Sequence, residues 1–210
     1  RVGSDLTQEL PEAAHTIPVL SLDKAYTADE VGAWLARTAR NAGTSLSFVC
    51  EEKIDGASIV LYYEKGLLAR AVTRGNGVVG NDVTGNVRTI GSVPLRLASP
   101  VTVAVRGEIF LAKSRFAKVN AAMEEPYANP RNLAAGTLRR VKSSEVAAVP
   151  LEIFVYEGYF EEQPATHRQV LERMAALGLR LDPRVGFFSD TDDLAQVRGA
   201  HPGWTVGAAA

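Results

Sequence analysis

Residues 58–74 constrain the fold more than any other part of the chain. Two stretches rich in β-branched and aromatic residues, Ser58–Tyr63 and Leu67–Arg74, flank the short connection Glu64-Lys65-Gly66. Such residues favour a pleated surface, and a short connection that contains glycine favours a hairpin. We therefore predict two antiparallel strands between Ile59 and Arg74.

Other parts of the chain have the same strand character. The further predicted strands are Phe48–Ile54, Val101–Phe110 and Leu151–Tyr156. They are joined by hairpins and irregular loops and alternate with helical patterns, which favours the α+β class with antiparallel sheets. With 210 residues and 46% hydrophobic content, the chain is long enough to bury one real core.

Three amphipathic stretches predict scaffold helices. Capping boxes at Thr27–Glu30 and Thr166–Gln169 begin two of them, and Gly43 and Gly178 should end them. The remaining helix is predicted over Ser114–Glu125. The side chains expected to face the core are Val31, Trp34, Leu35 and Thr38; Phe116, Val119 and Met123; and Val170, Leu171, Met174 and Leu177.

A lysine between carboxylates, just ahead of a glycine, is the strongest candidate for chemistry. In Cys50-Glu51-Glu52-Lys53-Ile54-Asp55-Gly56, strand alternation would place Glu51, Lys53 and Asp55 on one face. Taken alone, the pattern equally fits a solvated surface ion pair, which contributes about 0 to 1 kcal/mol. The segments downstream favour a nucleophilic lysine.

The segment Gly75–Asp82 matches G-x-G-x-x-G, the pattern of dinucleotide-binding and kinase loops. A dinucleotide fingerprint needs a strand-to-helix crossover and an acid about 20 residues on, but the preceding strand belongs to a hairpin. A kinase loop would have valine where Asp82 stands. A flexible turn and a backbone lid over a ligand both remain, and we favour the lid.

Two more segments add charge to the predicted site. Val101–Phe110 is an apolar strand interrupted by Arg106-Gly107-Glu108, and such charges must pair or bind something. Asn129 can cap a helix whose first position is Pro130. That helix carries Arg131 at its start, with Arg139 and Arg140 two turns later.

These segments, in this order, resemble the motifs of the adenylation domain of bacterial NAD-dependent DNA ligases. The matching stretches are Lys53–Gly56, Thr73–Gly77, Asp82–Ile90, Val105–Phe110 and Ala128–Arg139, preceded by His15–Tyr26. The resemblance implies a nucleotidyltransferase core of antiparallel sheets flanking the nucleotide. Asn76 and Asn81 depart from the pattern, because the family usually has acids there.

The resemblance also implies roles for individual residues. Lys53 would attack the α-phosphate of NAD to form lysyl-AMP and release nicotinamide mononucleotide. Glu51, with Ser21 and Leu22, would contact the adenine. Arg74 and Glu108 would lie around the ribose and α-phosphate, and Asp55 would be a further catalytic residue. The residues implied near phosphate or nicked DNA are Arg88, Arg131 and Arg139.

The implied cofactors are NAD, consumed as the AMP donor, and Mg²⁺, with no resident metal site in the chain. A lysine amine is normally protonated at neutral pH, and nearby carboxylates favour that charged form. We therefore expect Lys53 to become a nucleophile only once NAD and Mg²⁺ are bound. Nucleotidyl transfer then depends mainly on in-line geometry and on cations that neutralise charge.

The resemblance suggests a domain division and leaves two alternatives open. Residues 1–16 would be a lead-in segment and residues 17–207 an adenylation domain that stops before the last motifs of the family. Nicked double-stranded DNA would then be bound through a full-length enzyme. The alternatives are an adenosine- or NAD-binding module without catalysis and an ATP-using RNA ligase or capping-type nucleotidyltransferase.

Composition sets further expectations. A formal net charge of −1 is unlike a free-standing nucleic-acid-binding domain, which usually has a basic face. Cys50 is the only cysteine, so the chain has no disulfide framework, and we expect it to be a small buried residue. No apolar run is long enough to span a membrane. We expect a cytoplasmic monomer that does not bind membranes.

Overall fold

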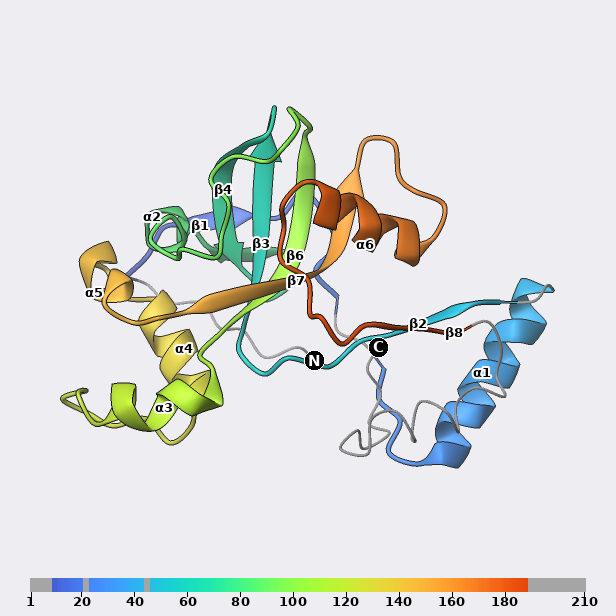
Figure 1. Cartoon of the computed structure of the whole chain (residues 1–210), viewed down its shortest axis with the longest axis horizontal. Coiled ribbons are helices and arrows are strands. Elements are labelled where there is room, and N and C mark those ends of the chain that lie inside the picture. The colour runs from blue at the N-terminus through green and yellow to red at the C-terminus, as the bar shows by residue number, and fades with distance from the viewer. Residues whose placement is uncertain (1–8, 21–22, 44–45, 189–210) are drawn as a thin grey trace. The chain divides into compact units, whose positions relative to one another are not determined.

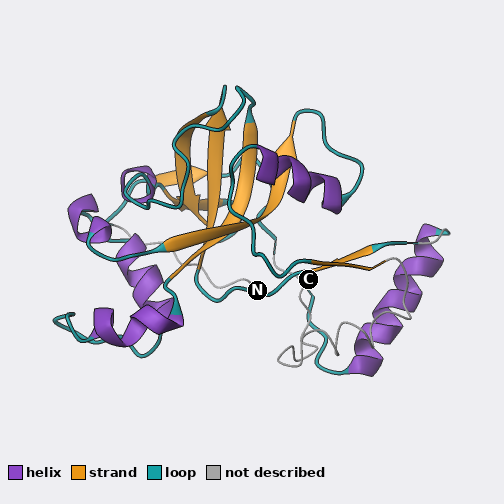
Figure 2. Ribbon diagram, viewed as in Figure 1, coloured by secondary structure: helices purple, strands orange, loops and turns teal. Residues whose placement is uncertain are grey.

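The structure is a computed structural model that describes residues 9–20, 23–43 and 46–188. The chain forms two compact units. One contains the residues up to Leu20 together with Ile54–Leu181, and the other contains Ser21–Lys53 and the residues from Asp182 onward. Both contain antiparallel strands and helices, which confirms the predicted α+β class (Figure 2).

The first unit is built around a four-stranded antiparallel sheet with strand order β4-β3-β6-β7 (Figure 1). Its strands are β1 (Glu12–Ala14), β3 (Ala57–Glu64), β4 (Leu67–Thr73), β5 (Val79–Asn81), β6 (Val103–Phe110) and β7 (Glu152–Phe160). Its helices are α2 (Thr84–Val87), α3 (Lys113–Asn120), α4 (Pro130–Leu138), α5 (Ser143–Ala147) and α6 (His167–Ala176). Strands β1 and β5 form a separate two-stranded sheet.

The predicted hairpin is confirmed as β3 and β4. Lys65 and Gly66 connect the strands with φ angles of 49° and 79°. Two consecutive residues with positive φ make a turn whose twist matches that of the strands, and glycine adopts this conformation without steric cost. The pairing places Ile59 opposite Thr73 and Tyr62 opposite Arg70.

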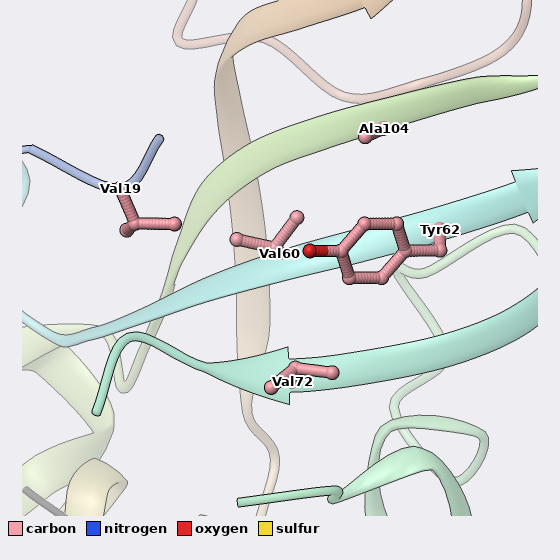
Figure 3. Packing of buried hydrophobic residues seen from close by; sticks show 5 residues of the cluster. All are labelled: Val19, Val60, Tyr62, Val72 and Ala104. Carbon is pink, nitrogen blue, oxygen red and sulfur yellow. The ribbon is translucent and has the colours of Figure 1, made fainter. Parts of the chain in front are cut away.

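Both faces of the central sheet are covered. On one face, Ile59, Leu61 and Tyr63 of β3 are buried. Helix α6 packs against β7, and α4 contacts β6 and β3. On the other face, a cluster of Val19, Val60, Tyr62, Val72 and Ala104 places Val19 over β3 and β4 (Figure 3).

The second unit contains α1 (Ala28–Ala42), β2 (Phe48–Cys50) and β8 (Gly186–Phe188). The predicted capping box at Thr27 is present, and Gly43 ends the helix with φ 64°. The prediction that Trp34 faces the core is wrong, because this side chain is 44% exposed. Its ring instead meets Phe48 edge-on, with the centroids 6.0 Å apart.

Several predicted elements differ in length from the observed ones. Strand β6 begins at Val103 rather than Val101, and β7 continues to Phe160 rather than Tyr156. The strand predicted over Phe48–Ile54 ends at Cys50, which pairs with Gly186, the first residue of β8. Beyond this point β8 offers no further backbone partner, so Glu51 to Asp55 are not in a strand. Helix α3 ends at Asn120 because the amide of that side chain bonds both the N–H and the C=O of Tyr127 and turns the chain back.

Burial on the helices differs in part from the prediction. Phe116, Val119 and Met123 are only half-buried, and α3 has no buried residue. In α6, the capping box at Thr166 is present. Its predicted core residues Val170, Leu171, Met174 and Leu177 are all buried.

Candidate functional site

The glycine of the lysine motif docks on strand β6 through its backbone. The N–H of Gly56 donates to the Glu108 carboxylate, with 3.2 Å between Gly56 N and Glu108 Oε1. A Cβ atom at position 56 would collide with the carbonyl oxygen of Ile109, so only glycine allows this approach. Two of the predicted site segments, Lys53–Gly56 and Arg106–Glu108, are therefore in direct contact.

A third segment joins them through an ion pair. Arg131 Nη1 lies 2.8 Å from Asp55 Oδ1, and the side chains are 50% and 67% exposed. Arg131 occupies the first turn of α4, where the side chain of Asn129 accepts a hydrogen bond from Asn132 N at 2.8 Å. The predicted cap and the first-position proline are confirmed, and they orient the start of the helix toward Asp55.

Strand register places Arg74 and Glu108 on one row across the sheet. Ser58 of β3 pairs with Glu108 of β6. On its other side, Ser58 accepts a backbone hydrogen bond from Arg74, with 3.2 Å between Arg74 N and Ser58 O. Side chains directly opposite in neighbouring strands share a face, so this end of the sheet carries a cation, a hydroxyl and a carboxylate in sequence.

Tyr156 belongs to the same end of the sheet and was missed by the sequence reasoning. A β-bulge opposite Arg106 and Gly107 makes Tyr156 the extra residue of β7. Its hydroxyl lies 3.3 Å from the Ser58 hydroxyl. Burial raises the pKa of Tyr156, against the lowering effect of Arg106. No signal within β7 marks the bulge, because it arises from the register with β6.

The charges in Arg106-Gly107-Glu108 pair as predicted. Arg106 Nη1 lies 2.7 Å from Glu157 Oε2. Burial by itself would lower the pKa of Arg106, but Tyr156 and Glu157 raise it above its ordinary value. The Arg106 guanidinium is therefore a buried cation on this face of the sheet.

The glycine-rich segment is joined to the lead-in rather than standing free. Gly75 has φ 57°, and a Cβ there would collide with the backbone of Val79. The Asn76 carbonyl Oδ1 accepts from the N–H groups of both Val78 and Val79 at 2.9 Å. Strand β5 then pairs with β1. The proposed lid over a ligand stays a prediction.

Asn81 stands where the resemblance led us to expect an acid. It is buried, and its Nδ2 donates to the carbonyl of Leu10 at 3.1 Å. A carboxylate in this place would have no N–H to donate and would meet that carbonyl with like partial charge. The hydrogen bond to the Leu10 carbonyl thus explains why asparagine rather than an acid stands at position 81.

The two remaining predicted arginines of this unit lie on helix ends. Arg88 is exposed at the end of α2 and donates from Nη2 to the carbonyl of Leu68 at 3.4 Å. Arg139 caps the end of α4 and donates from Nε to the carbonyl of Ala135 at 3.1 Å. Their predicted contacts with phosphate or DNA are not tested by these bonds.

In the second unit, Lys53 is exposed and Glu51 is half-buried. Glu52, between them, forms an ion pair with Arg184, which also bonds Asp182 at 3.1 Å. Cys50 is half-buried rather than buried, and burial raises its pKa. Ser21 and Leu22 lie outside the described residues.

The described part of the chain contains no group of three His, Cys, Asp or Glu side chains placed to hold a metal ion. Within the same residues, no helix has the length and apolar character needed to cross a membrane.

The antiparallel sheets, their flanking helices and the charged end of the central sheet define an α+β fold consistent with a nucleotidyltransferase core. Residues 7–200 match the family model of the NAD-dependent DNA ligase adenylation domain. The DNA ligase of Borreliella afzelii is 44% identical over 198 residues, covering 94% of this chain and 30% of that protein. The DNA ligase of Leptospira interrogans is 44% identical over 191 residues, covering 90% of this chain and 28% of that protein.

The chain belongs to the family of NAD-dependent DNA ligase adenylation domains. The resemblance drawn from the sequence is confirmed, and the ATP-using alternative loses its support. The chain spans about 30% of the length of the curated relatives it matches.

Proposed function

We propose that this chain carries the adenylation half-reaction of an NAD-dependent DNA ligase. The Lys53 amine, after loss of a proton, attacks the α-phosphorus of NAD. A P–N bond forms, the P–O bond of the pyrophosphate breaks, and nicotinamide mononucleotide leaves with that oxygen. The product is lysyl-AMP on the enzyme.

The contact between Gly56 and Glu108 carries this proposal. It attaches the lysine motif by its backbone to the end of β6. Lys53 is three residues before Gly56, so their Cα atoms lie within about 11 Å of each other whatever the path of the chain. This short sequence separation supports Lys53 as the nucleophile.

The charges of the first unit suit a nucleotide. Arg74 and Arg131 supply cations, and the start of α4 adds the positive end of a helix dipole. Preorganised positive charge stabilises the negative charge that develops on a phosphoryl group during its transfer. Glu108 can accept from a ribose hydroxyl, and the half-buried Tyr156 ring offers a surface on which a base can stack.

Mg²⁺ belongs to the same proposal. In nucleotidyl transfer this ion is usually held by substrate phosphates with one or two carboxylates, so a preformed cluster of protein ligands is not needed. It would supply charge neutralisation at the α-phosphate. Glu108 is the carboxylate of the described residues that best fits such a shared role, since it lies at the end of the sheet that also carries Ser58 and Arg74.

The relatives are named DNA ligase, and this name suggests the activity of the longer protein. We infer that AMP passes from Lys53 to the 5′-phosphate of nicked double-stranded DNA within a longer ligase, in replication and repair. Arg88, Arg131 and Arg139 are the proposed phosphate contacts. A cytoplasmic monomer remains part of this proposal.

Intact-protein mass spectrometry tests the half-reaction. Incubation with NAD and Mg²⁺ should add the mass of one AMP, and nicotinamide mononucleotide should remove it. Lys53→Ala should abolish the addition, whereas Lys118→Ala, an exposed lysine of α3, should leave it intact. Labelling that survives in Lys53→Ala refutes the nucleophile. Saturable adenosine binding without labelling would favour the noncatalytic module instead.

A further inference from the structure

One residue of the lead-in, His15, holds both sides of the glycine-rich turn that follows β4. Its backbone N–H donates to the carbonyl of Val78 at 2.9 Å. On the other side of the turn, its ring Nε2 lies 3.0 Å from the carbonyl oxygen of Thr73 and 3.3 Å from that of Arg74. All four residues belong to the first unit. The turn is therefore attached to His15 at both of its ends.

The hydrogen-bond partners define the tautomer of His15. Carbonyl oxygens only accept, so Nε2 carries the proton, and Nδ1 accepts from the Tyr62 hydroxyl at 3.0 Å. The oxygen of the same hydroxyl accepts from the N–H of Thr16 at 3.3 Å. Tyr62 is itself buried in the central sheet (Figure 3). The imidazole is therefore held from a packed part of the fold.

The backbone of Arg74 is held at both of its polar groups. Its N–H donates to Ser58 O at 3.2 Å, and its carbonyl accepts from Gly77 N at 3.0 Å as well as from His15. These bonds fix the peptide groups on both sides of the Cα atom, and so the direction in which the side chain leaves the backbone. A charged group that acts on a substrate needs such support from its surroundings.

Capping the end of a strand does not account for the whole arrangement. Strand β4 ends at Thr73, and one hydrogen bond to the carbonyl of this residue would complete that end. His15 also shares its ring N–H with the Arg74 carbonyl and makes a further bond across the turn, to Val78. Both additional bonds act on the turn that carries Arg74.

We propose that His15 is a positioning residue for Arg74, the cation that the proposed function places near the α-phosphate of the nucleotide. The proposal rests on the proposed function. Without the Nε2–H donor, the carbonyls of Thr73 and Arg74 lose their shared partner, and the guanidinium starts from a less defined point. A guanidinium bonds an anionic phosphate more strongly than a neutral group. The loss should therefore affect the binding of AMP much more than that of adenosine.

Isothermal titration calorimetry of the whole chain with AMP and with adenosine tests the proposal. His15→Phe keeps a ring but has no donor, so it should weaken AMP binding by about five- to tenfold, as for one lost hydrogen bond, and adenosine binding by less than about twofold. His15→Gln keeps an amide N–H and should recover most of the AMP affinity. Amide exchange of Gly77, whose N–H bonds the Arg74 carbonyl, should be faster in His15→Phe.

Ile17→Val is the matched control, because Ile17 packs against the same sheet face through an apolar side chain. It should loosen this packing and leave the affinities for both ligands unchanged. Tyr62→Phe provides a second variant if His15→Phe does not fold. It removes only the hydroxyl that holds Nδ1, so AMP binding should weaken in the same direction by a smaller factor.

Equal AMP affinity in folded His15→Phe and the wild-type chain overturns the proposal. So does an equal loss for AMP and adenosine, or a loss of AMP affinity in Ile17→Val. Nitrogen-15 NMR of the imidazole needs no nucleotide: the wild-type ring should carry its proton on Nε2, and a proton on Nδ1 alone would contradict the geometry. A wild-type chain that has the expected tautomer but binds neither ligand refutes the proposed function, and this proposal with it.

Discussion

Val19→Ala should destabilise the first unit by about 2 kcal/mol. The side chain is 1% exposed and faces Val60, Tyr62 and Val72. Removing two buried methyl groups at about 0.8 kcal/mol each gives roughly 1.6 kcal/mol, and a partly unfilled cavity adds up to about 1 kcal/mol. The segment can settle onto the sheet more easily than a core strand can, which keeps the total near the lower end of this range.

Urea unfolding followed by far-UV circular dichroism measures this change. The matched control is Val78→Ala, because Val78 is 69% exposed and only its backbone bonds the lead-in. This control should change the free energy of unfolding by less than about 0.5 kcal/mol. Amide exchange in residues 11–20 should increase only in Val19→Ala. Equal losses in both variants, or no loss in Val19→Ala, would refute the packing argument.

Three further predictions concern separate features. Gly32→Ala should stabilise α1 by about 0.5 to 1 kcal/mol, because a methyl group there meets no atom within 4 Å and alanine favours a helix; slower amide exchange in α1 would be the evidence, and faster exchange would contradict it. A double-mutant cycle with Asp55→Asn and Arg131→Gln should give a coupling of only about 0 to 1 kcal/mol at low salt and less at high salt, because both side chains are half or more exposed; a coupling that salt leaves unchanged would contradict the exposure. Burial lowers the pKa of His15 below its ordinary 6.5, so its contribution to stability is complete above pH 6.5 and is lost as the pH falls below that value. His15→Gln should flatten this slope in urea titrations, and an unchanged slope would show that another group is responsible.

Much of the local structure could be predicted from the sequence. Glu64-Lys65-Gly66 indicates a turn because two of these residues must adopt positive φ, and Thr27, Asn129 and Thr166 indicate helix starts because their side chains bond backbone N–H groups three residues on. The ordered motifs also identified the family. These signals lie within a few residues of the groups on which they act.

The arrangement of the site depended on tertiary pairing. The strand predicted through Ile54 ends at Cys50, because its partner strand β8 begins at Gly186, the residue that pairs with Cys50. Tyr156 reaches Ser58, 98 positions away, only because a bulge shifts β7 against β6.

The sequence alone therefore determined the family, the local turns and caps, and the chemical types of the candidate site residues. Tertiary structure decided which of these residues meet, as in the contacts of Glu108 with Gly56, Arg131 with Asp55 and Arg106 with Leu20. The physical reason is that each such contact joins segments distant in the chain, and strand register, which is a property of two strands together, sets which side chains become neighbours.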